Sequence, residues 1–408
     1  MTETFRPAFP DRDRPMISYG LSFTESVVKH AEETFHASRI YIICSGSLAR
    51  NTEHLDELKA KLGSKLAGVR IGMKPHSLWS EILEVVAEAK TVDADLLVTL
   101  GAGSLTDAAK IVSYVLLLHT VRKGPSSPNA ATKLKPSMVP VVCIPTSLSG
   151  GEYSAFAGAT NDATGRKHSF SGAGLPAPAL VVLDPALAAR TPSRIWLSTG
   201  VKAVDHCVET LCSLQSDAIA DADARRGLQK LVPGLLQTAK RGDSSSDLDA
   251  ARLTSQLGVA DAMSAASRGV PLGASHGIGH QLGPAGVGHG ETSCVLLPAV
   301  CAFNYTHEAN IARQDAVAAE LWRQPLAAEI FEARGFNRPG PSTGTPLSDL
   351  LDAFIRALGM PRTLKEFGIG GDKLDGIAEH SLHDRWVKTN PAPLDKDGVL
   401  EILTMVLG

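Results

Sequence analysis

Hydrophobic and polar residues change their spacing partway along this chain. Over residues 1–191, short apolar runs at 39–45, 93–100 and 139–145 end at serine, glycine or proline and alternate with stretches of helical period. Short apolar runs bounded by turn residues are typical of buried strands, and their alternation with helices indicates a mostly parallel sheet covered by helices. We therefore expect residues 1–191 to form an α/β domain.

Beyond this point the apolar positions recur at helical spacing over longer stretches, for example at 222–240, 347–359 and 397–408. They predict an all-helical domain over residues 192–408. Two domains also suit a chain of 408 residues that is 44% hydrophobic, which is too long for a single core.

Composition narrows the class of protein. The chain carries 40 basic and 43 acidic residues, a net charge of -3, so it offers no electrostatic footprint for nucleic acid. It has no apolar run long enough to span a membrane, and its polar N-terminus does not resemble a signal peptide. Six scattered cysteines predict buried thiols without disulfides. We expect a cytoplasmic enzyme whose partner is a small-molecule substrate.

Two small-residue loops follow predicted strands. In the first, "GAGSLTD", Gly101 and Gly103 would let a pyrophosphate approach the start of the next helix, where free amides favour a phosphate, and this helix also carries Ser104, Thr106 and Lys110. The alternative is an ordinary glycine turn. The second loop, "IPTSLSGGEYS", brings Thr146 and Ser147 to the end of another strand, where open α/β sheets bind ligands. Two such loops suggest one shared cleft.

A lysine and several histidines gather in the helical half. Lys202, His206 and Glu209 are spaced at i, i+4 and i+7, and His276 and His280 at i and i+4, so each set shares one helical face. His289 follows in a predicted loop. A single histidine is usually a core or surface residue, but this set indicates a functional pocket.

These motifs, in this order, resemble the iron-containing alcohol dehydrogenase superfamily, whose fold group includes dehydroquinate synthase. The segments that carry the resemblance are "GAGSLTDAAK", "IPTSLSGGE", "GRKHS", "STGVKAVDHCVE", "SHGIGHQLG" and "KTNPAP". The shorter second loop and "MKPHS" around His76 look most like the maleylacetate reductases.

The resemblance implies a Rossmann-like, dehydroquinate synthase-like α/β domain that binds NAD(P)H, a helical domain with the histidine and lysine pocket, and a homodimer. It implies that the cofactor cleft is lined by Gly101, Gly103, Ser104, Thr106, Lys110, Thr146, Ser147, Leu148 and Lys167. Ser45 stands near the position where NAD-preferring members have an aspartate. Its lack of charge relieves repulsion of a 2′-phosphate, which Arg50 can reach, so we expect NADP to be tolerated. Arg50 can equally be a solvated helix residue.

By the same resemblance, the metal-ligand positions of the family correspond to Lys202, His206, His276 and His289, so a lysine replaces an aspartate. Asp205 is expected to lie too far around the helix to substitute. An ammonium about 4 Å from a divalent ion, at an effective dielectric of about 20, is repelled by roughly 8 kcal/mol. We therefore expect no metal, with Lys202 polarising a substrate carbonyl or binding a carboxylate.

The expected reaction is hydride transfer to a carbonyl or activated alkene of a small substrate, with His280 as the first choice of proton donor and His276 or His206 as the next. Two alternatives remain open at this point. One is a non-redox enzyme of the same fold, for example one with Lys202 as a Schiff-base nucleophile. The other is a catalytically inactive binding protein.

Overall fold

A computed structural model describes residues 2–74, 77–123, 138–165, 167–171, 175, 177–240, 245–338 and 344–408. Within it the chain divides into two compact units, Met1–Arg190 and Thr191–Gly408. His76 lies outside the described residues, as does the side chain of Lys167. No helix in the described part of the chain is long and apolar enough to cross a membrane.

The first unit is built on a seven-stranded sheet with the order β1-β2-β9-β6-β5-β3-β4. All neighbours are parallel except β1 and β2, which form an antiparallel hairpin at one edge. The strands are β1 (Thr4–Phe9), β2 (Arg12–Tyr19), β3 (Ile40–Cys44), β4 (Leu66–Ile71), β5 (Leu96–Gly101), β6 (Val141–Pro145) and β9 (Leu180–Leu183). The predicted parallel sheet is confirmed. The β1–β2 hairpin and a second hairpin, β7 (Phe156–Thr160) with β8 (Lys167–Ser171), were not anticipated.

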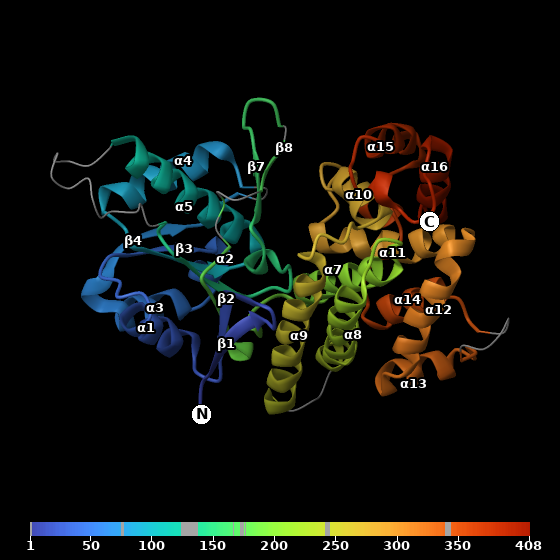
Figure 1. The fold of residues 1–408 in the computed structure, drawn as a ribbon, viewed down its shortest axis with the longest axis horizontal. Coiled ribbons are helices and arrows are strands. Elements are labelled where there is room, and N and C mark those ends of the chain that lie inside the picture. The colour runs from blue at the N-terminus through green and yellow to red at the C-terminus, as the bar shows by residue number, and fades with distance from the viewer. Residues whose placement is uncertain are drawn as a thin grey trace. The chain divides into compact units, whose positions relative to one another are not determined.

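Helices cover both faces of this sheet (Figure 1). Successive residues of β3 show why, because Ile40 and Ile42 enter one core while Tyr41 and Ile43 enter the other. One face is covered by α1 (Phe23–Glu33) and α3 (His54–Leu62), and the other by α4 (Trp79–Thr91) and α5 (Gly103–Lys123). Two short helices, α2 (Gly46–Asn51) and α6 (Pro185–Ala188), follow β3 and β9. The chain runs outward from β3 to β4 and then returns to β5 on the other side of β3. This reversal creates the switch point at which open α/β sheets bind ligands.

The second unit is helical, and no strand occurs among its described residues. Its helices are α7 (Ser193–Cys212), α8 (Ala218–Ala239), α9 (Ser245–Ala266), α10 (Ala274–Leu282), α11 (His289–Tyr305), α12 (Glu308–Trp322), α13 (Pro325–Ala333), α14 (Leu347–Ala357), α15 (Leu374–Ser381) and α16 (Lys396–Met405). The expected helical domain is confirmed.

Helix α7 is the centre of this unit. It packs against α8, α9, α11 and α12, and it is buried around most of its circumference. A helix buried on all sides is normally apolar throughout. The buried charges on α7, Lys202, Asp205 and Glu209, therefore require partners, and they mark the site described below.

Candidate active site

The glycine loop lies at the switch point of the sheet. Gly101 ends β5 with a φ of +143°, and a Cβ at this position would lie 2.7 Å from Ser45 Cβ and 2.9 Å from Leu105 Cδ1. Only glycine fits here, because both the conformation and the space exclude a side chain. The loop after β3 and the loop after β5 therefore pack directly on each other beside the first turn of α5.

The second loop lies alongside the first. The amide of Thr146 donates to the carbonyl of Gly101 at 3.2 Å, and a Cβ on Gly103 would lie 3.3 Å from Ser149 Cβ. Gly103 and Ser104 are partly exposed at the start of α5, whereas Thr106, Thr146, Ser147 and Leu148 are buried. The bare backbone at a 21-residue helix N-terminus suits the phosphates of a dinucleotide.

Lys110 has a different place from the one expected. Its ammonium is buried and donates to the carbonyls of Gly151 at 2.9 Å and Phe156, and it forms an ion pair with Asp107 at 3.0 Å. Asp107 in turn accepts from the amide of Gly158. With its protons engaged by protein atoms, Lys110 anchors the second loop and β7 to α5, which corrects the expectation that it faces the cofactor.

Ser45 precedes the first residue of α2, and Arg50 lies in the last turn of this six-residue helix. Ser45 Oγ is 2.9 Å from Ser47 Oγ, and an Arg50 guanidinium nitrogen is 3.0 Å from where a Cβ of Gly46 would be. Arg50 is exposed, and its guanidinium lies over the backbone of Gly46. The side chains described at the end of β3 include a guanidinium and hydroxyls where a ribose-binding carboxylate would stand.

In the helical unit, Asp205 occupies the centre of a buried polar cluster. Its Oδ2 accepts from Ser275 Oγ at 2.9 Å and from Ser293 Oγ, and it lies 3.5 Å from His276 Nδ1. The same oxygen is 3.8 Å from Lys202 Nζ. The expectation that Asp205 lies too far around the helix to take the place of a pocket carboxylate is wrong, because residues three apart on a helix are neighbours whose side chains can meet.

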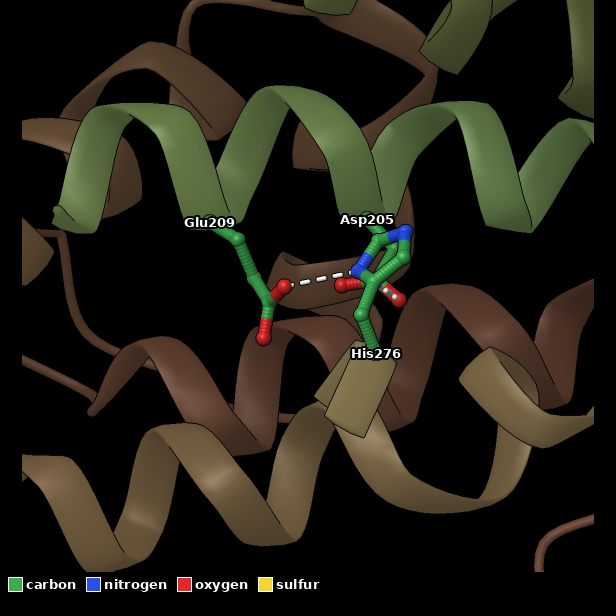
Figure 2. A group of neighbouring side chains, drawn as sticks. All are labelled: Asp205, Glu209 and His276. Carbon is green, nitrogen blue, oxygen red and sulfur yellow. Dashed lines mark hydrogen bonds and ion pairs between the residues drawn. The ribbon is translucent and has the colours of Figure 1, made fainter. Parts of the chain in front are cut away.

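Glu209 fixes the ring of the buried His276 (Figure 2). Its carboxylate accepts from the amides of Gly273 and Ser275, both at 2.9 Å, and from His276 Nδ1 at 2.7 Å. It therefore caps α10 and sets the His276 tautomer with the proton on Nδ1. Burial raises the pKa of Glu209 to about 7, although hydrogen bonds from Gly273 and Ser275 and the charge of Lys202 oppose it.

Lys202, His206 and His276 share this buried environment. Burial lowers the pKa of Lys202, and the charges of Asp205 and Glu209 oppose the shift. Burial, together with the neighbouring His276 and Lys202, holds the pKa of His206 well below its ordinary value. The rings of His206 and His276 are 4.5 Å apart, and His206 Nδ1 and His276 Nε2 are buried without a hydrogen-bond partner. Such atoms are costly unless a ligand or water meets them.

The remaining two histidines lie nearer the surface. His280, in the last turn of α10, is 40% exposed, and its Nδ1 is 2.9 Å from Asp384 Oδ2. His289 is exposed and begins α11, so the expectation that it lies in a loop is wrong. Both belong to the same region, because their charges contribute to the low pKa of His276 after burial and Lys202. Asp384 was not anticipated, since no local pattern connects it with a histidine 104 residues earlier.

Family models match both units. The model for iron-containing alcohol dehydrogenase matches residues 20–185, and the C-terminal model of the same family matches residues 196–407. The chain belongs to the iron-containing alcohol dehydrogenase family. The resemblance inferred from the motifs is thereby confirmed, and the chain is an oxidoreductase of the dehydrogenase or reductase type.

Similar proteins come from fungi and bacteria. Dehydrogenase ALT3 of Alternaria alternata is 38% identical over 90% of this chain and 99% of its own length. Dehydrogenase FUM7 of Gibberella moniliformis is 36% identical over 98% of each. Among solved structures, maleylacetate reductase from Rhizobium sp. strain MTP-10005 is 25% identical with a TM-score of 0.72, covering 96% of this chain and 95% of that one. NADH-dependent butanol dehydrogenase A from Thermotoga maritima, at 19% identity and a TM-score of 0.77 over 99% and 100% of the chains, shares the fold.

The described side chains of this family member include one group of donors that could hold a metal ion. Among the described residues, the one set of three donors close together is Asp205, Glu209 and His276. The 2.7 Å between Glu209 and His276 Nδ1 is a hydrogen bond, whereas two ligands bound at about 2.0–2.1 Å to a tetrahedral ion would stand roughly 3.3 Å apart. In the described structure His206, His276 and His289 do not converge as a triad of donors. The cation of Lys202 lies in this same cluster.

Proposed function

We propose that this chain is an NAD(P)H-dependent reductase that works without a metal ion and uses the buried ammonium of Lys202 as its electrophile. The observation that carries the proposal is the position of that ammonium, 2% exposed and 3.8 Å from Asp205, beside the unpartnered nitrogens of His206 and His276. The proposed substrate is a small carbonyl compound or activated alkene, and a carboxylate on it would complement the cation.

The candidate groups of each unit have roles that follow from their own surroundings. When NAD(P)H is bound, its nicotinamide supplies a hydride. Gly101, Gly103 and Ser104 would hold the pyrophosphate of the dinucleotide. Lys202 stabilises negative charge that develops on the substrate oxygen, in a buried site where such an interaction is strong. His206 and His276, kept neutral by their lowered pKa values, can hydrogen-bond to the substrate without adding charge. His280, which is partly exposed, is placed to exchange a proton with solvent.

We further propose that NADPH is accepted. Arg50, with the hydroxyls of Ser45 and Ser47, offers hydrogen-bond donors suited to a 2′-phosphate at the end of β3. In this proposal the lack of an acidic residue there removes the charge repulsion that would otherwise discriminate against NADP.

The experiment combines an analysis of the metal content of the purified protein with an activity assay. Protein purified without chelators should contain far less than one equivalent of iron or zinc. It should also oxidise NADPH with small aldehydes, ketones or maleylacetate at a rate that neither EDTA nor added Fe²⁺ or Zn²⁺ changes. Near-stoichiometric metal that is required for turnover would overturn the metal-independent part of the proposal and leave the reductase assignment intact.

A nucleophilic role for Lys202 within the same pocket is the second candidate, and one observation favours it. Burial lowers the pKa of Lys202, which increases the fraction of neutral amine able to attack a carbonyl. Borohydride treatment in the presence of substrate would trap the resulting imine as a mass increase on Lys202. Such an adduct would show that the Lys202 amine attacks the substrate carbonyl, and its absence would leave the electrostatic role of Lys202.

A further inference from the structure

His280 and Asp384 form a second histidine–carboxylate pair on helix α10. His280 Nδ1 lies 2.9 Å from Asp384 Oδ2, while Asp384 Oδ1 accepts from the amide of Trp386 at 2.8 Å. One turn earlier on the same helix, His276 Nδ1 meets Glu209 in the same manner. Resting on the proposed reductase function, we infer that Asp384 is a positioning residue: it keeps one proton on Nδ1 of His280, so that the doubly protonated ring gives its Nε2 proton to the substrate.

The segment that carries Asp384 is fixed to α10 by close backbone packing. A Cβ on Gly277 would lie 2.6 Å from Val387 Cγ2 and 2.8 Å from the Val387 amide nitrogen, so glycine permits this approach one turn before His280. Thr389 Oγ1 donates to the carbonyl of Leu272 at 2.6 Å. Asn390 Oδ1 accepts from the amide of Ala274 at 3.1 Å. These contacts hold the carboxylate in register with the ring, as a positioning role requires.

Exposure separates the two pairs on α10. The His276 side chain is 4% exposed and that of Glu209 6%, whereas His280 is 40% exposed and Asp384 14%. A buried imidazole whose pKa lies well below its ordinary value is a poor proton carrier. His280 is exposed enough to exchange protons with water, whereas Asp384 is mostly buried and can therefore keep a fixed hydrogen bond to the ring. The pair at the surface end of α10 is therefore the one suited to proton transfer.

The proton balance of the step is simple. Hydride addition to a carbonyl carbon breaks the C=O π bond and leaves an alkoxide, which takes the proton from Nε2 of the His280 imidazolium. The neutral ring keeps its Nδ1–H against Asp384 and regains a proton at Nε2 from water. A carboxylate in this position fixes the tautomer and stabilises the charged ring without itself becoming protonated.

The test is a double-mutant cycle with a matched control. His280→Gln should lower kcat about 100-fold, the scale of general acid catalysis, and Asp384→Asn should lower it about tenfold or more. Neither should change the Kd of NADPH measured by fluorescence. In the His280→Gln background, Asp384→Asn should have no further effect, because it acts through the ring. Asp375→Asn is the control, since Asp375 is an exposed ion-pair partner of Lys396 on the neighbouring α15. Equal effects of Asp384→Asn and Asp375→Asn, or additivity in the double variant, would overturn the inference.

A spectroscopic readout does not depend on turnover. In protein labelled with ¹⁵N-histidine, the signals lost in His280→Gln identify His280, and in the unmodified chain they should report a neutral ring protonated at Nδ1. Asp384→Asn should shift this ring toward a tautomer mixture, while Asp375→Asn should not. A neutral ring in the unmodified chain with its proton on Nε2 and none on Nδ1 would refute the role of Asp384. An absence of redox turnover together with the Nδ1 tautomer would instead count against the proposed function alone.

Discussion

Asp205 Oδ2 lies 3.8 Å from Lys202 Nζ, and neither side chain is more than 2% exposed. The lysine therefore does not enter the pocket as an isolated charge. Its carboxylate partner is itself held by Ser275 and Ser293. The arrangement keeps a cation at a fixed position in a buried pocket, which is the property that the proposed mechanism requires.

Removing this cation should affect turnover far more than cofactor binding. Lys202→Met keeps most of the side-chain volume and removes the charge that stabilises the substrate oxygen, so kcat should fall about 100- to 1,000-fold, as when an oxyanion-hole donor is removed. The Kd of NADPH should stay within about twofold. Steady-state kinetics and fluorescence titration check both values, and unchanged turnover would exclude Lys202 as the electrophile.

The same pair makes a prediction for stability. Lys202→Met leaves Asp205 buried without its cation, which should lower the free energy of unfolding by about 3–5 kcal/mol. Adding Asp205→Asn should recover part of this loss, because the uncompensated charge is gone. Urea denaturation of the unmodified chain, Lys202→Met and the double variant Lys202→Met with Asp205→Asn measures these free energies of unfolding. Lys230→Met is the control, since its partner Asp261 lies in a more exposed pair whose loss should cost less than about 1 kcal/mol.

The sequence predicted the elements whose signal is local. Apolar runs identified β3, β5 and β6, and helical periodicity identified α8, α14 and α16. The sequence did not predict features that depend on the packing of distant segments. The "GHG" around His289 suggests a loop, yet a Cβ on Gly290 would lie 2.6 Å from the backbone carbon of Ser198. This glycine serves the close packing of α11 on α7 and forms no turn.

The candidate site was likewise predicted only where local spacing or family motifs identify its residues. Lys202, His206 and the α10 histidines follow from spacing and family resemblance, whereas Asp384 and Ser293 are joined to their partners only by tertiary contacts. Lys110 was misassigned for a related reason. Its position in the helix was correctly read, but its contacts come from carbonyls of a loop about 40 residues later.

Arg50 should control the choice between the two nicotinamide cofactors. If it binds the 2′-phosphate, Arg50→Ala should raise the KM of NADPH about tenfold, which corresponds to the roughly 1.4 kcal/mol of one charged hydrogen bond. The KM of NADH should not change. Lys59→Ala, which removes a partly exposed cation on the neighbouring α3, provides the control. An equal effect on both cofactors would remove Arg50 from the phosphate site.

Gly101 should tolerate no side chain. Gly101→Ala places a methyl group 2.7 Å from Ser45 Cβ in a backbone conformation that alanine avoids, so it should cost about 1–3 kcal/mol and weaken NADPH binding. Gly269→Ala separates the two causes, because Gly269 also has a positive φ of 86° but nothing within 4 Å of its Cβ position. Denaturation and NADPH titration should show a larger loss for Gly101→Ala. Similar losses in both variants would mean that backbone conformation alone accounts for the effect.

Glu3 should make the stability of the first unit depend on pH. Its carboxylate binds Lys29, Ser18 and His30, joining β1 to β2 and α1. Burial alone would raise the pKa of Glu3, but these hydrogen bonds outweigh it and lower the pKa from 4.5 to about 2. A depressed folded-state pKa means that the stabilisation is complete above about pH 4.5 and is lost as the pH falls toward 2. Glu3→Gln should thus cost about 1–3 kcal/mol at pH 7, the value of hydrogen bonds to a charged group. Urea titrations should show that the difference in the free energy of unfolding between Glu3→Gln and the unmodified chain becomes smaller from pH 4.5 to pH 3. A difference that stays constant over this range would show that the ionised carboxylate does not hold these elements together.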